Sequence, residues 1–220
     1  MVVEKRTNRQ AAIFAAAEQR HHESVVRRWR ESAPDRTNGF TIQDDLIEGR
    51  WNGRISDGGI RSVRKYLKHP TQFLILKGQA GLGKSTLAVT MISELLQNHY
   101  PLYTSGRYDS APLLMQEFSF PDRDSEDPIR RSIRVPILLL DDVGAANESM
   151  TAHQRKGLWS VIDARWGNRN KLTLMTTNMS VTSTNEGQGL IDWFGESAWD
   201  RIKDDLTLID FHGESMRGED

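Results

Sequence analysis

The spacing of hydrophobic residues changes along this chain, from a helical repeat near the N-terminus to short apolar stretches that alternate with amphipathic ones. The helical repeat covers residues 8–31, where side chains recur at steps of three and four. They are Phe14, Ala17, His21, Val25 and Trp29. Such a stripe along one face predicts an amphipathic helix. Ala33-Pro34-Asp35 would end it, and the turn-rich residues 36–39 would form a linker.

From residue 60 onward, apolar runs and helical repeats alternate. The expected order is a helix at 60–68, a strand at 73–76, a helix at 85–97, strands at 101–105 and 137–140, a helix at 154–165, and strands at 172–176 and 206–211. Buried strands that alternate with helices are typical of a parallel sheet covered by helices. We therefore expect an α/β fold with a mainly helical N-terminal segment.

The composition describes a globular protein. Of 220 residues, 37% are hydrophobic and 27% are charged, and no apolar run approaches the ~20 residues that span a bilayer. The apolar residues 11–17 are followed by Glu18 and Arg20, unlike a signal peptide. The absence of cysteine excludes disulfides and Cys-based zinc sites. We expect a cytoplasmic protein with no membrane partner.

Charge is distributed unevenly along the chain. Residues 1–70 contain 14 Lys and Arg against 9 Asp and Glu, whereas residues 71–220 contain 15 against 21. A basic N-terminal third suggests an acidic partner or nucleic acid. A solvated helix face would give the same count, so both interpretations stay open.

The clearest chemical motif is Gly78-Gln79-Ala80-Gly81-Leu82-Gly83-Lys84-Ser85, which satisfies G-x-x-x-x-G-K-[ST]. It lies between an expected strand and an expected helix, as a phosphate-binding P-loop requires. Glycines let backbone N–H groups turn toward phosphate oxygens, and the helix N-terminus adds positive charge. We expect Lys84 to reach the β- and γ-phosphates of ATP and Ser85 to bind Mg²⁺, with Thr86 ending the nucleotide-binding segment. The alternative is a glycine-rich turn without a ligand.

Two carboxylates, Asp141 and Asp142, follow the apolar strand expected at 137–140. A parallel strand carries such groups to the edge of the sheet where ligands bind. Asp141 comes 57 residues after Lys84, a separation that suits a Walker B segment. We expect Asp141 to hold Mg²⁺ through water and Asp142 to act as general base on the attacking water. Acids that only cap a turn are the alternative.

Two other residues carry weaker signals. Asn178 follows the strand expected at 172–176, so its amide could orient water or contact the γ-phosphate, or could cap a turn. Arg201 lies in a helical stretch, and nothing in its local sequence makes it catalytic. Its alternative role is that of an exposed residue paired with Asp204 or Asp205.

Taken in order, these segments resemble the AAA+ ATPases of the DnaC helicase-loader and IstB transposition-helper group, which is related to the initiator DnaA. Beside the P-loop, the resemblance rests on Asp141-Asp142-Val143-Gly144, Asp163-Ala164-Arg165-Trp166, Thr176-Thr177-Asn178 and Gly195-Glu196-Ser197-Ala198-Trp199-Asp200-Arg201. Gly213-Glu214-Ser215-Met216-Arg217 is similar to the ending of many members. The P-loop alone indicates only a P-loop NTPase. The ordered set, over about residues 60–217, indicates this group.

The resemblance implies an AAA+ P-loop domain that hydrolyses ATP with Mg²⁺. Asn178 would be the sensor 1 residue, and Arg201 would be an arginine finger that acts on ATP bound by a neighbouring subunit. The active form would then be a homo-oligomer, joined through the ATP site and assembled on single-stranded DNA. Residues 1–40 would bind a replicative DNA helicase, and residues 41–220 would form the ATPase domain.

The chain also departs from the group. Ser197 stands where loaders may carry a sensor 2 arginine, so the resemblance gives that contact no residue here. The chain lacks room for the helical lid domain of larger AAA+ proteins. Its compact size suggests a phage or mobile-element protein.

Other functions compatible with these motifs remain open. One is an IstB-type helper ATPase that binds duplex DNA and directs a transposase. Another is a nucleotide-gated adaptor with negligible turnover. A small-molecule P-loop kinase is favoured least, because residues 101–134 offer no obvious acceptor pocket.

Five arginines before Asp141 are candidates for DNA contact. They are Arg107, Arg123, Arg130, Arg131 and Arg134. Nearby acids could instead balance them as exposed ion pairs. Those acids are Asp122, Asp124, Glu126 and Asp127.

Overall fold

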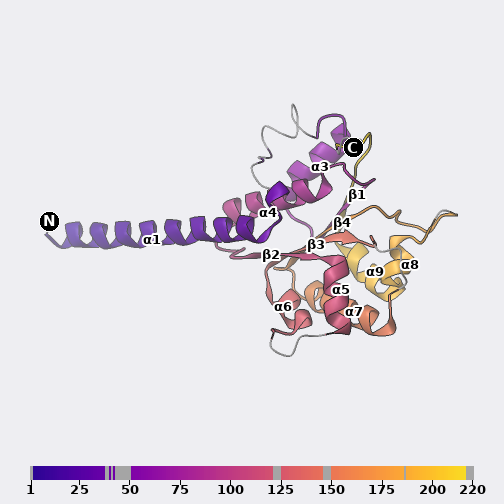
Figure 1. Ribbon diagram of the computed structural model, residues 1–220. Coiled ribbons are helices and arrows are strands. Elements are labelled where there is room, and N and C mark those ends of the chain that lie inside the picture. The colour runs from indigo at the N-terminus through magenta and orange to yellow at the C-terminus, as the bar shows by residue number, and fades with distance from the viewer. Residues whose placement is uncertain are drawn as a thin grey trace.

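The computed structural model (Figure 1) describes residues 2–37, 40, 42, 51–120, 125–145, 150–185 and 187–216, with side chains from residue 15 onward except that of Arg36. The helices are α1 (Val2–Ser32), η1 (Asp35–Thr37), α3 (Asp57–Lys68), α4 (Lys84–Asn98), α5 (Ala111–Ser119), α6 (Pro128–Arg134), α7 (Ala152–Trp166), α8 (Leu190–Phe194) and α9 (Glu196–Asp204). The strands are β1 (Phe73–Lys77), β2 (Gly106–Ser110), β3 (Ile137–Val143), β4 (Leu172–Thr177) and β5 (Leu206–Asp210).

In the described part of the chain, all five strands form one parallel sheet in the order β2-β3-β4-β1-β5. β1 lies between β4 and β5, and β3 lies beyond β4. Because the strands are parallel, the segments that follow β1, β3 and β4 meet at one edge of the sheet, where ligands bind in such folds. The predicted α/β fold is confirmed.

The three inner strands, β1, β3 and β4, bury both of their faces, and each face of the sheet has its own core. Leu74 and Leu76 of β1 belong to a cluster with α1, α3 and α4. Phe73 and Ile75, which alternate with them, belong to a second cluster with α5, α7, α8 and α9. Figure 1 shows these two groups of helices on opposite sides of the sheet. Strands covered on both sides read as continuous apolar runs, which made them recognisable in the sequence.

The expected strand at 101–105 is wrong, because β2 begins only at Gly106. β2 lies at the edge of the sheet and reads Gly-Arg-Tyr-Asp-Ser, so it carries little apolar signal. The apolar Leu102 and Tyr103 lie in the preceding turn region instead. The last strand ends at Asp210, and Phe211 forms an antiparallel bridge with Ile55.

The last third of α1 packs against α4. Val25, Val26 and Trp29 are buried in the core that includes α4. The indole Nε1 of Trp29 donates a hydrogen bond to the carbonyl oxygen of Val89 at 3.2 Å. Val25 and Trp29 of the predicted apolar stripe therefore pack on the rest of the chain.

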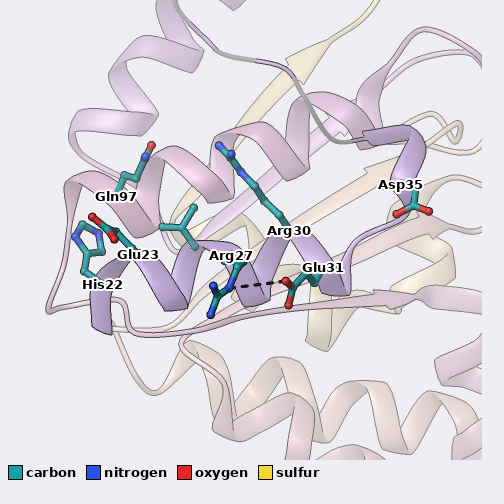
Figure 2. Close-up of a pocket in the computed structure, with 8 residues that line it drawn as sticks. His22, Glu23, Arg27, Arg30, Glu31, Asp35 and Gln97 are labelled. Atoms are coloured by element: carbon teal, nitrogen blue, oxygen red, sulfur yellow. Dashed lines mark ion pairs between the residues drawn. The ribbon is translucent and has the colours of Figure 1, made fainter. Parts of the chain in front are cut away.

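The earlier part of α1 has different surroundings. Residues 15–20 are exposed, and Figure 1 shows this end of the helix extending away from the body. The side chain of Phe14 lies outside the described residues. Figure 2 shows the groove of about 530 Å³ where α1 meets α4, lined by charged side chains of both signs, including the Arg27–Glu31 pair. No described helix is long and apolar enough to cross a membrane.

Candidate nucleotide-binding site

The loop between β1 and α4 has the backbone that its glycines were expected to provide. φ is +80° at both Gly81 and Gly83, a region that residues with a Cβ rarely adopt. α4 begins directly afterwards at Lys84. The first N–H groups of a helix have no partner within it, so this end of α4 favours an anion.

Lys84 extends from the start of α4 toward the end of β4. Its Nζ donates hydrogen bonds to the carbonyl oxygens of Gly78 at 2.8 Å and Gln79 at 2.7 Å, and to Oδ1 of Asn178 at 2.8 Å. The residue is only 6% exposed. Its ammonium group is therefore positioned between the loop and Asn178, where it can exchange an oxygen partner for a phosphate oxygen.

A cavity of about 340 Å³ opens over this loop. Eight predicted site residues line it: Ala80, Gly81, Gly83, Lys84, Ser85, Thr86, Asp142 and Asn178. Thr37, Ala145 and Met216, which were not predicted as site residues, line it as well. Gly78 and Gln79 contribute through their carbonyl contacts with Lys84. Leu82 is buried in the core beneath the loop. Asp141 and Arg201 are outside the set of residues that line the cavity.

The two predicted carboxylates lie in different environments. Asp141 is 1% exposed and accepts hydrogen bonds from the hydroxyls of Tyr108 at 2.8 Å and Thr176 at 2.5 Å. Asp142 is exposed, and its N–H donates to Oγ1 of Thr176 at 2.9 Å. The Asp142 backbone has a φ of +59°, beside a register shift between β3 and β4. This irregularity directs Asp142 toward the cavity while Asp141 stays within the sheet.

Comparison with known proteins agrees with this geometry. A family model described as IstB-like ATP binding protein matches residues 63–220. This chain belongs to the IstB-like ATP-binding protein family. The match spans every predicted site residue from Gly78 to Arg201. A search of curated protein sequences gave no match.

Solved structures share the fold of this IstB-like chain. The DnaC helicase loader superposes with a TM-score of 0.60 at 19% identity, covering 81% of this chain and 100% of that one. DnaI gives 0.62 at 20% identity, over 81% and 94%. The replication initiator DnaA bound to AMPPCP and single-stranded DNA gives 0.59 at 15% identity, over 80% of this chain and 50% of that one. The AAA+ fold and the resemblance to the DnaC/IstB group are therefore confirmed.

The cavity of the IstB-like domain suits a nucleoside triphosphate and Mg²⁺. The loop backbone and Lys84 offer positive charge to phosphates. Ser85 supplies a hydroxyl oxygen at the cavity, and Mg²⁺ in nucleotide sites is held by one or two protein groups together with phosphate oxygens and water. Such a site needs no dedicated cluster of ligands. Among the described residues, no group of three His, Cys, Asp or Glu side chains could hold a metal.

Arg201 of α9 lies against α7. Its Nε forms an ion pair with Oδ1 of Asp163 at 2.5 Å, and its Nη1 donates to the carbonyl oxygen of Ser197 at 2.9 Å. The guanidinium carbon lies 5.4 Å from the ring centroids of both Trp159 and Trp166, which are each 37% exposed. The guanidinium is thus oriented by three side chains of α7 at a partly exposed surface.

The pairing of Arg201 with Asp204 or Asp205 is wrong. Both carboxylates contact Arg169 instead, at 3.6 and 3.5 Å. Helical spacing suggested a local partner on α9, whereas tertiary packing of α9 on α7 supplies Asp163.

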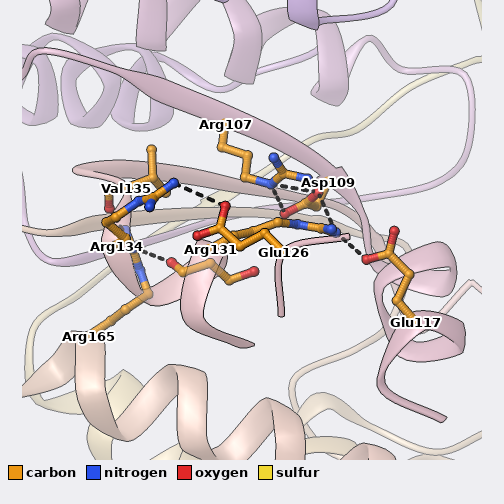
Figure 3. A network of polar contacts seen from close by, with 9 residues as sticks. Arg107, Asp109, Glu117, Glu126, Arg131, Arg134, Val135 and Arg165 are labelled. Atoms are coloured by element: carbon orange, nitrogen blue, oxygen red, sulfur yellow. Dashed lines mark hydrogen bonds and ion pairs between the residues drawn. The ribbon is translucent and has the colours of Figure 1, made fainter. Parts of the chain in front are cut away.

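Three of the five candidate arginines, Arg107, Arg131 and Arg134, are paired with carboxylates, as Figure 3 shows. Arg107 and Arg131 both contact Asp109, Arg131 also pairs with Glu117, and Arg134 pairs with Glu126. Asp127 accepts hydrogen bonds from the N–H groups of Ile129 and Arg130 and so caps α6. Arg123, Asp122 and Asp124 lie outside the described residues. These pairs favour balanced charge over a free basic patch.

Arg165 of α7 is fully buried and holds several backbone segments together. Its guanidinium donates to the carbonyl oxygens of Ser132, Val135, Pro136 and Leu172 and to the hydroxyl of Thr173. Burial lowers the pKa of Arg165 to about 9, so it remains charged at neutral pH. Its role is structural.

Sequence reasoning missed several residues of the site. Tyr108 was not recognised as a partner of Asp141, because β2 carried too little apolar signal. Thr37 and Met216 come from segments with no motif known to line a cavity. The segment Gly213-Glu214-Ser215-Met216-Arg217 was recognised by its resemblance to other members of the group. That resemblance did not indicate that Met216 lines the cavity.

Proposed function

We propose that this chain is a Mg²⁺-dependent ATPase that assembles on single-stranded DNA and loads a replicative helicase. The observation that carries the catalytic part is the contact between Lys84 and Asn178 in a cavity that Asp142 also lines. The P-loop cation, a strand-end amide and a carboxylate come from three separate strand ends. Their meeting in one polar cavity is the arrangement that ATP hydrolysis needs.

Each residue has a distinct task in this proposal. Bound ATP supplies the γ-phosphoryl group, and Mg²⁺ neutralises charge on it. Lys84 holds phosphate oxygens, and Ser85 and Asp141 hold the metal, Asp141 through water. Asp142 accepts a proton from the attacking water. Asn178 orients that water once the Lys84 contact is shared with phosphate.

Arg201 would act on a neighbouring subunit. Lys84 is the only cation among the described residues that line the cavity, and charge that develops on a γ-phosphate is commonly stabilised by a second one. Arg201 is partly exposed and is oriented by Asp163 and two tryptophans. A neighbour's cavity placed against this surface would complete both sites and make the oligomer the active form.

The loading role is supported by the fold shared with DnaC and DnaI and by the N-terminal part of the chain. The exposed end of α1 extends beyond the body and lies in the basic third of the sequence. A projecting helix of this kind suits a partner-binding role. We therefore assign helicase contact to the exposed end of α1, up to residue 20.

The test combines turnover with loading. Purified chain is mixed with ATP, Mg²⁺ and a hexameric replicative helicase from the same source, with and without single-stranded DNA. We expect hydrolysis that rises with single-stranded DNA, and transfer of helicase onto a DNA circle only when ATP is present. Loading with no turnover would instead indicate a nucleotide-gated adaptor.

An IstB-type transposition helper is the second candidate, because the matching family model is described as IstB-like ATP binding protein. It would bind duplex DNA and a transposase. Competition between duplex and single-stranded DNA of equal length distinguishes the two roles. Preference for duplex, with no helicase association, would replace the loader by the helper.

A further inference from the structure

The segment that follows β5 returns to the P-loop and is bound to it at two points. The N–H of Phe211 donates to the carbonyl oxygen of Lys77 at 2.7 Å, and the N–H of Met216 donates to that of Gly81 at 2.9 Å. Between these points, the N–H of His212 donates to the carbonyl oxygen of Arg54 at 2.8 Å. Residues 211–216 therefore run alongside the loop that would hold the phosphates.

Side chains fit closely where this segment meets the loop. A Cβ at Gly81 would lie 2.0 Å from Oγ of Ser215, and one at Gly83 would lie 2.4 Å from Cε of Met216. Trp51, which is fully buried, donates its indole N–H to the carbonyl oxygen of Gly83 at 3.2 Å. These glycines leave room for the segment on the outer side of the loop, in addition to providing the backbone conformation.

The sheet order shows which end of the cavity this is. β4 and β3 lie on one side of β1, and they carry Asn178 and Asp142. β5 lies on the other side of β1 and leads to Met216. Lys84 contacts Asn178, so the γ-phosphate end faces β4 and β3. Thr37 comes from a turn of helix that packs on α4, and Met216 comes from the segment after β5. Both line the cavity, and neither belongs to β3 or β4.

We propose that Met216 forms the nucleoside end of the cavity, with Thr37 beside it, and contacts the nucleobase of ATP. This inference rests on the proposed function, because it assumes that the P-loop holds the phosphates. A thioether side chain is polarisable and packs well against an aromatic ring. The base is therefore bound by a side chain whose backbone is tied to the phosphate-binding loop itself. Neither the glycine-rich motif nor the acidic pair assigns this role.

The test separates the two ends of the ligand by measuring the binding of ATP and of inorganic triphosphate, which has no nucleoside. Isothermal titration calorimetry is done on the wild type, Met216→Ala, Met216→Leu and Lys84→Ala. Met150→Ala is a matched control, because Met150 lines a different cavity, beside Trp193. We expect Met216→Ala to bind ATP about tenfold more weakly and triphosphate as the wild type does. Met216→Leu should keep most of the affinity, and Lys84→Ala should lose both ligands.

Each failure has its own signature. If Met216→Ala binds ATP like the wild type while Lys84→Ala does not, the nucleoside assignment is overturned and the P-loop stands. If Met216→Ala loses ATP and triphosphate equally, Met216 only holds the loop, which also overturns the base contact. If Lys84→Ala keeps both ligands, the proposed function itself fails. If Met216→Ala unfolds, the binding of ATP and of triphosphate is compared in Met216→Gln instead, because glutamine has a side chain of similar length.

Discussion

The N-terminal helix divides into an exposed part and a part of the core, and deletions should show this division. Val25 and Val26 are 2% and 7% exposed and Trp29 is 1% exposed. Burying a valine side chain contributes roughly 1.5–3 kcal/mol, and truncating a buried aromatic residue costs about 3–5 kcal/mol. Removing all three therefore costs about 6–11 kcal/mol, comparable to the roughly 5–15 kcal/mol that stabilises an ordinary domain.

Deletion of residues 1–40 should consequently leave a chain that does not fold cooperatively, whereas deletion of residues 1–20 should change the free energy of unfolding by less than about 0.5 kcal/mol. Urea unfolding followed by far-ultraviolet circular dichroism measures both. The shorter deletion should also keep ATP affinity and lose helicase association. A chain of residues 41–220 that unfolds at the wild-type midpoint would refute this reasoning and restore the boundary at residue 40.

Four substitutions test the site itself. Lys84→Ala should abolish productive ATP binding while leaving the fold intact, and an affinity within threefold of the wild type, about 0.65 kcal/mol, would contradict the P-loop assignment. Asp142→Asn should bind ATP but hydrolyse it slowly, because an amide cannot accept the proton from water. Asp141→Asn should instead raise the Mg²⁺ concentration needed for turnover. Equal, negligible effects of both substitutions on turnover would contradict both assigned roles. Arg201→Ala should bind ATP and hydrolyse it poorly, with a loss of up to about 10³–10⁵-fold if chemistry depends on it fully. Mixing it with Lys84→Ala should restore part of the activity, while Lys203→Ala, on the same helix, should behave like the wild type.

The sequence was sufficient to predict the elements whose burial requires a recognisable pattern of apolar residues. β1, β3 and β4 lie inside the sheet and are buried over most of their length by apolar residues, so their positions were predicted closely. β2 is an edge strand with mixed polarity, and its pairing with β3 depends on backbone hydrogen bonds that any residue can make. Local pattern therefore misplaced it. The sheet order also comes from tertiary packing and left no local signal.

In the candidate site, too, local motifs were predicted from the sequence and contacts between distant segments were not. The P-loop and the acid pair are local motifs, and their residues were predicted from spacing alone. The difference between Asp141 and Asp142 depends on a register shift between β3 and β4 and on Thr176, which bonds to both residues. The wall formed by Met216 depends on the return of the chain after β5. Contacts between segments far apart in sequence cannot be predicted from either segment by itself.

At the end of α7, the short segment from Asp163 to Arg165 makes contacts on two opposite faces of the helix. Successive residues of an α-helix are about 100° apart, so Asp163 and Arg165 lie on opposite faces while Trp159, Asp163 and Trp166 share one. The first face is partly exposed and orients Arg201. The opposite face inserts Arg165 into the core, where it binds the backbone before β3 and at the start of β4. These are the two strands whose ends carry Asp142 and Asn178. A displacement of α7 would therefore change both the surface that we propose faces a neighbouring subunit and the strands that support the candidate site. This gives a physical reason for the Asp-x-Arg spacing.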